Sequence, residues 1–173
     1  MEIIKKYHSG AVHFMLPYFK DSRGSFIKLF NSIQLLDQFN IRQVNYVVTM
    51  DRETIRGLHF QKKPFQEAKI FRVLKGRARF VFCNIDSDSK YYKRAESVDL
   101  DNNTESLYIP RGFATGYEVL EECTEICYFS DNDYHEVSES GIRWSDRMVA
   151  HLWKTKNPNL SDKDKNWKDW IQS

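Results

Sequence analysis

The chain has 173 residues, of which 41% are hydrophobic and 29% are charged, and its formal net charge is +2. Such a balance of charges gives no electrostatic reason to expect a nucleic acid or a membrane as partner. There is no apolar run long enough for a membrane-spanning helix, and the start MEIIKKYHSG lacks the apolar stretch of a secretory signal. The three cysteines show no metal-ligand spacing and are typical of reduced thiols. We therefore expect a single cytoplasmic domain over 1–173.

In chain order, the first predicted element is a short helix over 32–39, SIQLLDQF. Short strand patterns follow, separated by turn signals such as DSDSK and DNNTE, at 42–50, 68–74, 77–82, 106–110, 116–120 and 124–130. A second helix is predicted over 161–171, where Trp167, Trp170 and Ile171 would share one face. This succession predicts a mainly β protein with a sandwich or barrel fold.

The clearest strand pattern lies over 77–82, RARFVF. Its residues Ala78, Phe80 and Phe82 alternate with the intervening side chains at the period of a half-buried strand. Gly76 precedes it and suits a tight turn. The pattern predicts a hairpin that joins this strand to the one over 68–74.

Eight segments, in order along nearly the whole chain, carry a resemblance to a known family. They are DSRGSF (21–26), QVN (43–45), RGLHFQ (56–61), QEAKIFRVLKG (66–76), LYIPRGFATGY (107–117), TEICYFSDNDY (124–134), GIRWSD (141–146) and LSDKD (160–164). The chain resembles the dTDP-4-dehydrorhamnose 3,5-epimerase family, whose members are cupin-type jelly-roll β-sandwiches. The resemblance implies a nucleotide-linked 4-keto-6-deoxy sugar as substrate, epimerisation next to the ketone, and neither a metal nor an organic cofactor.

The implied chemistry can be matched to residues. Inverting a carbon next to a ketone needs a base on one face, stabilisation of the enolate oxygen, and a proton donor on the other face. His59 suits the base because imidazole titrates near neutral pH. The resemblance implies that Asp164 orients it. Lys69 fits the cation beside the enolate, and Tyr128 fits the donor on the opposite face.

Each of these residues also has a structural interpretation. A lone histidine in a strand is more often a hydrogen-bonded structural group. Asp164 follows Ser161 at the third position of a helical first turn, where a carboxylate favours the helix dipole. Tyr128 also fits a core aromatic, and Lys69 also fits a surface lysine of a strand.

The mixture of residues in RGLHFQ follows from the implied site. Strict alternation would put Arg56 and His59 on opposite faces of a strand. If both face the substrate, the strand must break its period between them, and Gly57 is the residue that permits a bulge there.

The nucleotide side is implied by the family motif D-x-R-G-x-F-x-E. Arg23 supplies a cation for the diphosphate and Phe26 a ring for the base, but Lys28 replaces the acidic residue. The family's usual GFAHGF is here GFATGY, so that Thr115 replaces a histidine. These two departures leave open which nucleotide is bound and whether one or two carbons are inverted.

The other substrate contacts implied by the resemblance come from four residues of the matched segments. Arg56 suits an oxyanion of the sugar or diphosphate, since guanidinium offers two parallel donors. Tyr134 suits stacking on the base, and the remaining two contacts are Gln43 and Asn45. Strand exchange at the N-terminus of family members implies a homodimer.

We expect no metal site. Many cupins hold a metal with a His-x-His pair, whereas Gly57 and Gln61 stand two residues either side of His59. Three functions stay open: an epimerase, a jelly-roll 3,4-ketoisomerase, and a non-enzymatic sugar-nucleotide-binding module. The epimerase includes the alternative of a single-centre enzyme that acts on a CDP- or other NDP-sugar of an antibiotic, capsule or O-antigen pathway. Retention of a base and an acid together favours an enzyme, and the two tail segments favour the epimerase.

Overall fold

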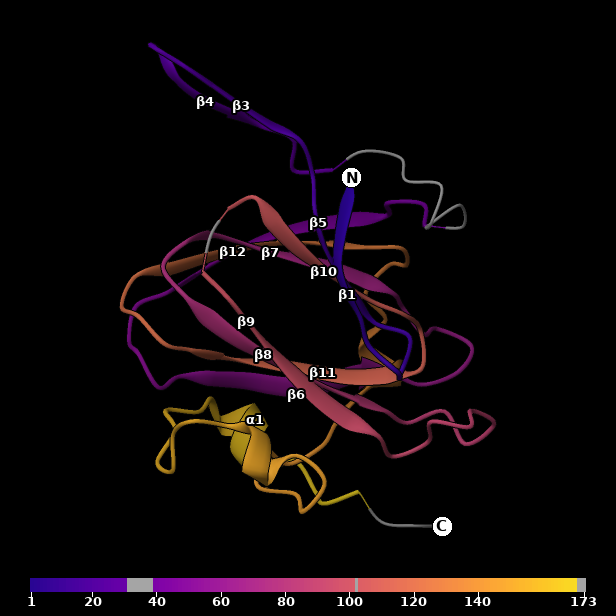
Figure 1. Cartoon of the computed structure of the whole chain (residues 1–173). Helices are drawn as coiled ribbons and strands as arrows, with labels where there is room; N and C mark the ends of the chain where they lie inside the picture. The colour runs from indigo at the N-terminus through magenta and orange to yellow at the C-terminus, as the bar shows by residue number, and fades with distance from the viewer. Residues whose placement is uncertain (31–38, 102, 171–173) are drawn as a thin grey trace.

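The computed structural model describes residues 1–30, 39–101 and 103–170, and it is a sandwich of two antiparallel sheets (Figure 1). The six-stranded sheet has the order β1 (Glu2–Lys6), β2 (Val12–Met15), β10 (Glu105–Ile109), β7 (Lys69–Lys75), β12 (Thr124–Ser130) and β5 (Gln43–Thr49). The five-stranded sheet has the order β13 (Glu139–Gly141), β6 (Ile55–Gln61), β11 (Phe113–Val119), β8 (Ala78–Asn84) and β9 (Ala95–Leu100). The predicted mainly β, jelly-roll class is confirmed.

The predicted hairpin between β7 and β8 is wrong, although both strands exist. The chain does turn at Gly76, which has a φ of +79°, but β7 and β8 belong to opposite sheets. Phe71 and Phe80 face each other across the inter-sheet core, with ring centroids 5.1 Å apart. When the chain passes from one sheet to the other, the residues that face the core on the first strand are followed by residues that face the core on the second. The two strands therefore show the same alternation of apolar and polar residues as a hairpin within one sheet.

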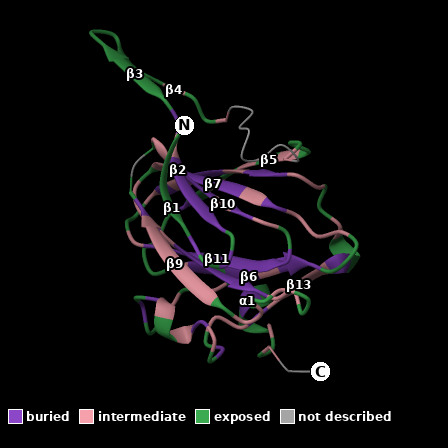
Figure 2. Ribbon diagram, turned by 45° about the vertical axis from the view of Figure 1, so that its right-hand side comes forward, coloured by how far each residue is buried: buried purple, intermediate pink, exposed green. Residues whose placement is uncertain are grey.

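A second apolar layer covers the outer face of the five-stranded sheet. The C-terminal segment runs beneath this sheet in Figure 1 and buries Ile142, Val149 and Trp153 against Ile55 and Leu58 of β6. Strand β8 therefore packs on both faces, with Phe80 and Phe82 in the inter-sheet core and Val81 and Cys83 in the outer layer; Figure 2 shows the neighbouring strand β11 buried in the same way. This layer brings the C-terminal end of the described chain against β6.

The C-terminal helix is much shorter than predicted. Helix α1 spans only Asp162–Lys165, and the other helical segments among the described residues are the 3₁₀ turns η2 (Glu136–Ser138) and η3 (Ala150–Leu152). After α1, the backbone of Trp170 donates to Asp146 at 2.7 Å and its ring packs on Phe60, so tertiary contacts override the helical periodicity. The helix predicted over 32–39 falls, except for its last residue, outside the described residues, as does Ile171.

Two exposed regions stand apart from this core. The hairpin of β3 (Tyr18–Asp21) and β4 (Gly24–Ile27) projects away from the sandwich (Figures 1 and 2), and Phe26 is 64% exposed. Edge strand β5 turns Val44, Tyr46 and Val48 outward, with Tyr46 59% exposed. None of the described helices has the length and hydropathy that crossing a bilayer requires.

Candidate active site

A bulge in β6 brings Arg56 and His59 to the same side of the sheet. The two residues are three positions apart on β6, yet they face Tyr117 and Thr115, which are two positions apart on β11. Gly57 occupies the bulge with a φ of +117°, and a Cβ there would lie 2.7 Å from the Cα of Gly116. Because that approach excludes any side chain, the glycine is required. The break predicted from RGLHFQ is confirmed.

Between the two sheets, the bulge faces a cavity of about 270 Å³. One wall comes from β6, β11 and the start of α1, and the other comes from β5, β7 and β12. The cavity is lined by Val47, Arg56, His59, Lys69, Phe71, Thr115, Gly116, Tyr117, Tyr128, Ser161, Lys163 and Asp164. All four residues predicted to be catalytic thus lie in one cavity, together with Arg56 and Thr115.

The first wall carries a histidine–carboxylate pair. Nε2 of His59 lies 2.5 Å from Oδ1 of Asp164, whose side chain is only 4% exposed. Burial alone would raise the pKa of Asp164, but hydrogen bonds from His59, from the N–H of Gly57 and from the indole of Trp167 hold that pKa below its ordinary value. Since an ionised carboxylate only accepts, Nε2 of His59 carries the hydrogen of this contact, and Nδ1 is the ring nitrogen left to face a substrate.

The two interpretations of Asp164 describe the same geometry. Its backbone N–H donates to Oγ of Ser161 at 3.1 Å, which is the N-cap bond of α1. Its side chain at the same time pairs with His59. The cap therefore fixes the short helix in the position from which the carboxylate reaches the histidine.

The opposite wall carries a cation and a phenol on neighbouring strands. Nζ of Lys69 lies 6.0 Å from the ring centroid of Tyr128. Burial raises the pKa of Tyr128, and the nearby charge of Glu67 raises it further. The phenol is therefore neutral at neutral pH and has a proton to give. Lys69 pairs with Glu67 at 2.8 Å.

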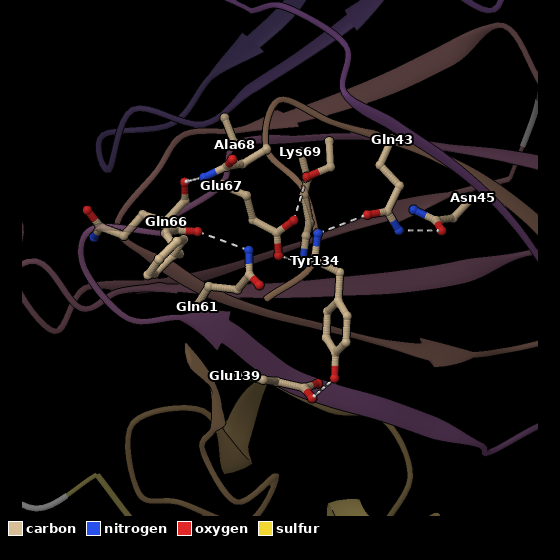
Figure 3. A network of polar contacts seen from close by, with 12 residues as sticks. Gln43, Asn45, Gln61, Gln66, Glu67, Ala68, Lys69, Tyr134 and Glu139 are labelled. Carbon is tan, nitrogen blue, oxygen red and sulfur yellow. Dashed lines mark hydrogen bonds and ion pairs between the residues drawn. The ribbon is translucent and has the colours of Figure 1, made fainter. Parts of the chain in front are cut away.

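A smaller cavity of about 120 Å³ adjoins the first and shares His59, Lys69 and Tyr128 with it. Three predicted substrate-binding residues line it, Gln43, Asn45 and Tyr134. They are joined to one another: Nε2 of Gln43 donates to Asn45 at 2.9 Å, and the backbone N–H of Tyr134 donates to Oε1 of Gln43 at 3.2 Å (Figure 3). The hydroxyl of Tyr134 donates to Glu139 at 2.6 Å, while 54% of the residue is exposed.

The structure does not bring the predicted nucleotide motif to this site within one chain. Arg23 and Phe26 lie on the projecting hairpin, and neither they nor Lys28 lines either cavity. Arg23 is paired with Asp21 at 2.7 Å, on the same hairpin. Lys28 follows β4, and its carbonyl accepts from Arg72 at 2.8 Å.

Gln61, the last residue of the RGLHFQ segment, has a structural role. Its side-chain nitrogen donates to the carbonyls of Phe65 and Asp133 at 2.9 and 3.1 Å, and its oxygen accepts from the N–H of His135 at 2.5 Å. The buried amide thus ties together the two loops that flank the smaller cavity.

Four further residues of the two cavities that carry an ionisable side chain were missed by the sequence analysis: Glu67, Tyr117, Glu139 and Lys163. Glu67, Tyr117 and Lys163 lie within matched segments, where only the neighbouring residues had been assigned roles. Lys163, which lines the larger cavity, pairs with Glu139, which lines the smaller one. Burial raises the pKa of the Tyr117 phenol to about 12. For Glu67, Tyr117 and Lys163, the position within a matched segment was the available signal, whereas Glu139 lies between two segments and had none.

Together, the walls hold a base, a cation and a phenolic acid around one space. This arrangement can remove a proton from a carbon next to a carbonyl group and return a proton from the other side. In the part of the chain that the structure describes, no three His, Cys, Asp or Glu side chains are grouped so as to hold a metal ion.

Comparison with known proteins identifies the family. The family model described as dTDP-4-dehydrorhamnose 3,5-epimerase matches residues 7–172. The chain belongs to this family of sugar-nucleotide epimerases. It is 32% identical over 178 aligned residues to the dTDP-4-dehydrorhamnose 3,5-epimerase of Shigella flexneri, covering 100% of this chain and 98% of the relative. The family indicated by the eight segments is confirmed.

Solved structures of epimerases in the family have the same fold. The dTDP-4-dehydrorhamnose 3,5-epimerase of Bacillus anthracis, solved with TDP and PPi bound, superposes with a TM-score of 0.91 at 30% identity and covers 98% of this chain and 99% of its own. The epimerase of Legionella pneumophila, solved in complex with dTDP-4-keto-L-rhamnose, gives a TM-score of 0.88 at 26% identity, covering 97% and 92% of the two chains.

Proposed function

We propose that this protein is a cofactor-independent epimerase that inverts C3, C5 or both of a nucleotide-linked 4-keto-6-deoxyhexose. One observation carries the proposal: the His59–Asp164 pair and the Tyr128 phenol stand on opposite walls of one cavity, with Lys69 beside the phenol. Inversion requires a base and an acid on opposite faces of the reacting carbon. A binding site alone would need neither.

In the first step, Nδ1 of His59 removes the hydrogen from the carbon next to the ketone as a proton. The electron pair of the broken C–H bond moves onto the ketone oxygen, which becomes an enolate. Asp164 stabilises the imidazolium that forms, and the ammonium of Lys69 stabilises the enolate oxygen. A positioned base contributes about 10²–10⁴-fold, and a fixed donor at the oxyanion contributes about 10²–10³-fold.

In the second step, the hydroxyl of Tyr128 gives its proton to the same carbon from the opposite wall, and the carbonyl group reforms. The carbon is now inverted, His59 holds the proton that was removed, and Tyr128 is a phenolate. Exchange of protons with water resets both groups before the next inversion. A proton abstracted in D₂O is therefore replaced by deuterium in the product.

The ligands of two structural relatives support a nucleoside diphosphate sugar as substrate. The Bacillus anthracis enzyme was solved with TDP and PPi, and the Legionella pneumophila enzyme with dTDP-4-keto-L-rhamnose. In this chain, Arg56 is the cavity cation without an ion pair among the described residues, since Lys69 and Lys163 each have a carboxylate. We therefore place the diphosphate at the end of the cavity near Arg56.

The substrate site includes a second copy of the chain in this proposal. Strand β5 is a sheet edge whose outward face is apolar, and the hairpin exposes Tyr18, Phe19 and Phe26. A homodimer that covers β5 would bury these side chains and stabilise the assembly. It would also carry the hairpin of one subunit, with Arg23, Phe26 and Lys28, to the cavity of the other.

The test is incubation with dTDP-, CDP-, UDP- and GDP-linked 4-keto-6-deoxyglucose in D₂O, followed by NMR. We expect deuterium to enter at C3, C5 or both, with inversion, for one nucleotide in preference to the others. Deuterium at one carbon alone identifies a single-centre epimerase. Movement of the keto group from C4 to C3 identifies a ketoisomerase, and binding without exchange identifies a binding module; either result overturns the proposal.

A further inference from the structure

A carboxylate that the proposed reaction does not use lies inside the site. Glu67 contacts Nζ of Lys69 at 2.8 Å, and the two side chains are only 13% and 15% exposed. Glu67 lines the smaller cavity together with Tyr128 and His59. A buried carboxylate beside the cation that is proposed to stabilise the enolate needs an explanation, because the negative charge of Glu67 also repels the enolate.

Glu67 is itself held in place from several sides. The hydroxyl of Ser130 donates to its second carboxylate oxygen, and Ser130 is the direct partner of Lys69 in the β7–β12 ladder. The next residue, Ala68, exchanges hydrogen bonds with Asp131: its N–H donates to the side chain at 2.7 Å and its carbonyl accepts from the backbone at 3.2 Å. Figure 3 shows Glu67 beside Lys69 within this network.

Such anchoring determines where the ammonium of Lys69 lies. A lysine side chain has four rotatable bonds and about 2 kcal/mol of rotamer entropy, so a free lysine samples many positions. An ammonium group has three donors. When one of them is held by a fixed carboxylate, the other two point away from Glu67 and are available to a ligand in the cavities that Lys69 and His59 both line.

We propose that Glu67 is a positioning residue that acts through Lys69, holding the ammonium, with the help of Ser130, where the ketone oxygen becomes negative. The inference rests on the proposed function, because only an enolate-forming reaction needs a cation fixed at that point. Positioning outweighs repulsion because the carboxylate is separated from the enolate by the ammonium that both contact.

The experiment is a double-mutant cycle of Glu67→Gln and Lys69→Met, with wild-type exchange in D₂O measured first. Glutamine keeps the size of the side chain and removes its charge. We expect Glu67→Gln alone to lower kcat and the rate of C–H exchange about 10- to 100-fold. KM should change much less, because the contact matters mainly as charge develops on the oxygen. In the Lys69→Met background, the same substitution should lower the rate no further and should raise it if anything, because only the repulsion between Glu67 and the enolate is then removed.

Two further variants separate positioning from support of the loop. Ser130→Ala removes one holder of the carboxylate and should lower kcat by a smaller factor, again only when Lys69 is present. Asp88→Asn removes a carboxylate from an exposed pair with Lys63, outside both cavities, and should leave kcat unchanged. Thermal unfolding of every variant reports whether the fold persists, and Ser130→Ala carries the test if Glu67→Gln does not fold.

The outcomes distinguish this inference from the proposed function. A wild-type protein that exchanges no C–H hydrogen with any nucleotide sugar overturns the proposed function and the inference with it. An active wild type whose kcat is unchanged or raised by Glu67→Gln overturns the inference alone. An equal loss from Glu67→Gln in the presence and absence of Lys69 has the same consequence, because Glu67 then supports only the loop.

Discussion

The inter-sheet cavity and the β3–β4 hairpin contain the two halves of the predicted site, and they differ in how far one chain completes them. In the cavity, two of the side chains predicted to be catalytic have a fixed charged partner: His59 has Asp164, and Lys69 has Glu67. On the hairpin, Phe26 is 64% exposed, and Arg23 reaches only Asp21 of the same turn. The cavity is organised by the fold, whereas almost every residue of the two hairpin strands is exposed.

This difference separates chemistry from recognition. A buried carboxylate with three donors needs the sandwich and its C-terminal layer, so the groups proposed to transfer protons are positioned when one chain folds. An exposed aromatic and a guanidinium on a projecting hairpin gain a function only when another surface meets them. Substitutions in the cavity should therefore change kcat, and substitutions on the hairpin should change binding.

The largest effect should come from His59→Asn. Asparagine keeps the shape and part of the hydrogen bonding but cannot accept a proton at neutral pH. We expect turnover and C–H exchange to fall by at least about 10²–10⁴-fold, while nucleotide binding stays within a few-fold of the wild type. NMR in D₂O measures the first quantity and calorimetry the second. Activity within a few-fold of the wild type would remove His59 as the base.

Next in size, Tyr128→Phe should separate the two steps of the reaction. The variant keeps the base and the cation, so the proton is still removed and still exchanges with D₂O. It lacks the donor on the opposite wall, so epimer formation should fall about 10²-fold or more, and exchange much less. NMR of the same sample measures both. If both fall equally, Tyr128 only positions the substrate.

Mixing two variant subunits tests directly whether the cavity and the hairpin of one site come from different chains. His59→Asn has a normal hairpin and no base, and Phe26→Ala has a normal cavity and an impaired hairpin. If each hairpin completes the partner's cavity, each mixed dimer holds one complete site, and an equal mixture formed by co-expression regains roughly a quarter of wild-type activity. No gain over Phe26→Ala alone would mean that the hairpin serves its own chain. A monomer in light scattering would contradict the dimer itself.

The sequence was most informative where a single residue type has a strict backbone consequence. Gly57 between two polar residues predicted the bulge, and a Cβ there has no room. Ser161 three residues before Asp164 predicted the cap. The pairing of Asp164 with His59 spans 105 positions, and no periodicity encodes it; only the resemblance of both segments to one family indicated it.

Sequence reasoning did less well where the answer depends on register between distant strands. The alternation over 77–82 is the same for a hairpin and for a corner between sheets, so β7 and β8 were paired incorrectly. Nothing in the sequence around Glu67 distinguishes it from an ordinary surface acid. Only the pairing of β7 with β12 places Ser130 beside Lys69, where it binds Glu67. The tryptophans after α1 fit a helical face, but their contacts with β6 and Asp146 end the helix early.

The smallest expected effect concerns Lys28, where the hairpin departs from the family motif. An acidic side chain accepts hydrogen bonds from a base or ribose, whereas lysine only donates. Thymine presents a ring N–H at the edge where cytosine presents an acceptor nitrogen. Because a mismatched contact costs about 1–3 kcal/mol, Lys28→Glu should raise the affinity for dTDP relative to CDP by about tenfold. Lys20→Glu makes the same charge change on the same hairpin and should leave the ratio unchanged. Calorimetry of dTDP and CDP with the wild type and the two variants measures the ratio of affinities. An equal change of this ratio in both variants indicates a general charge effect. An unchanged ratio in Lys28→Glu means that Lys28 does not contact the base.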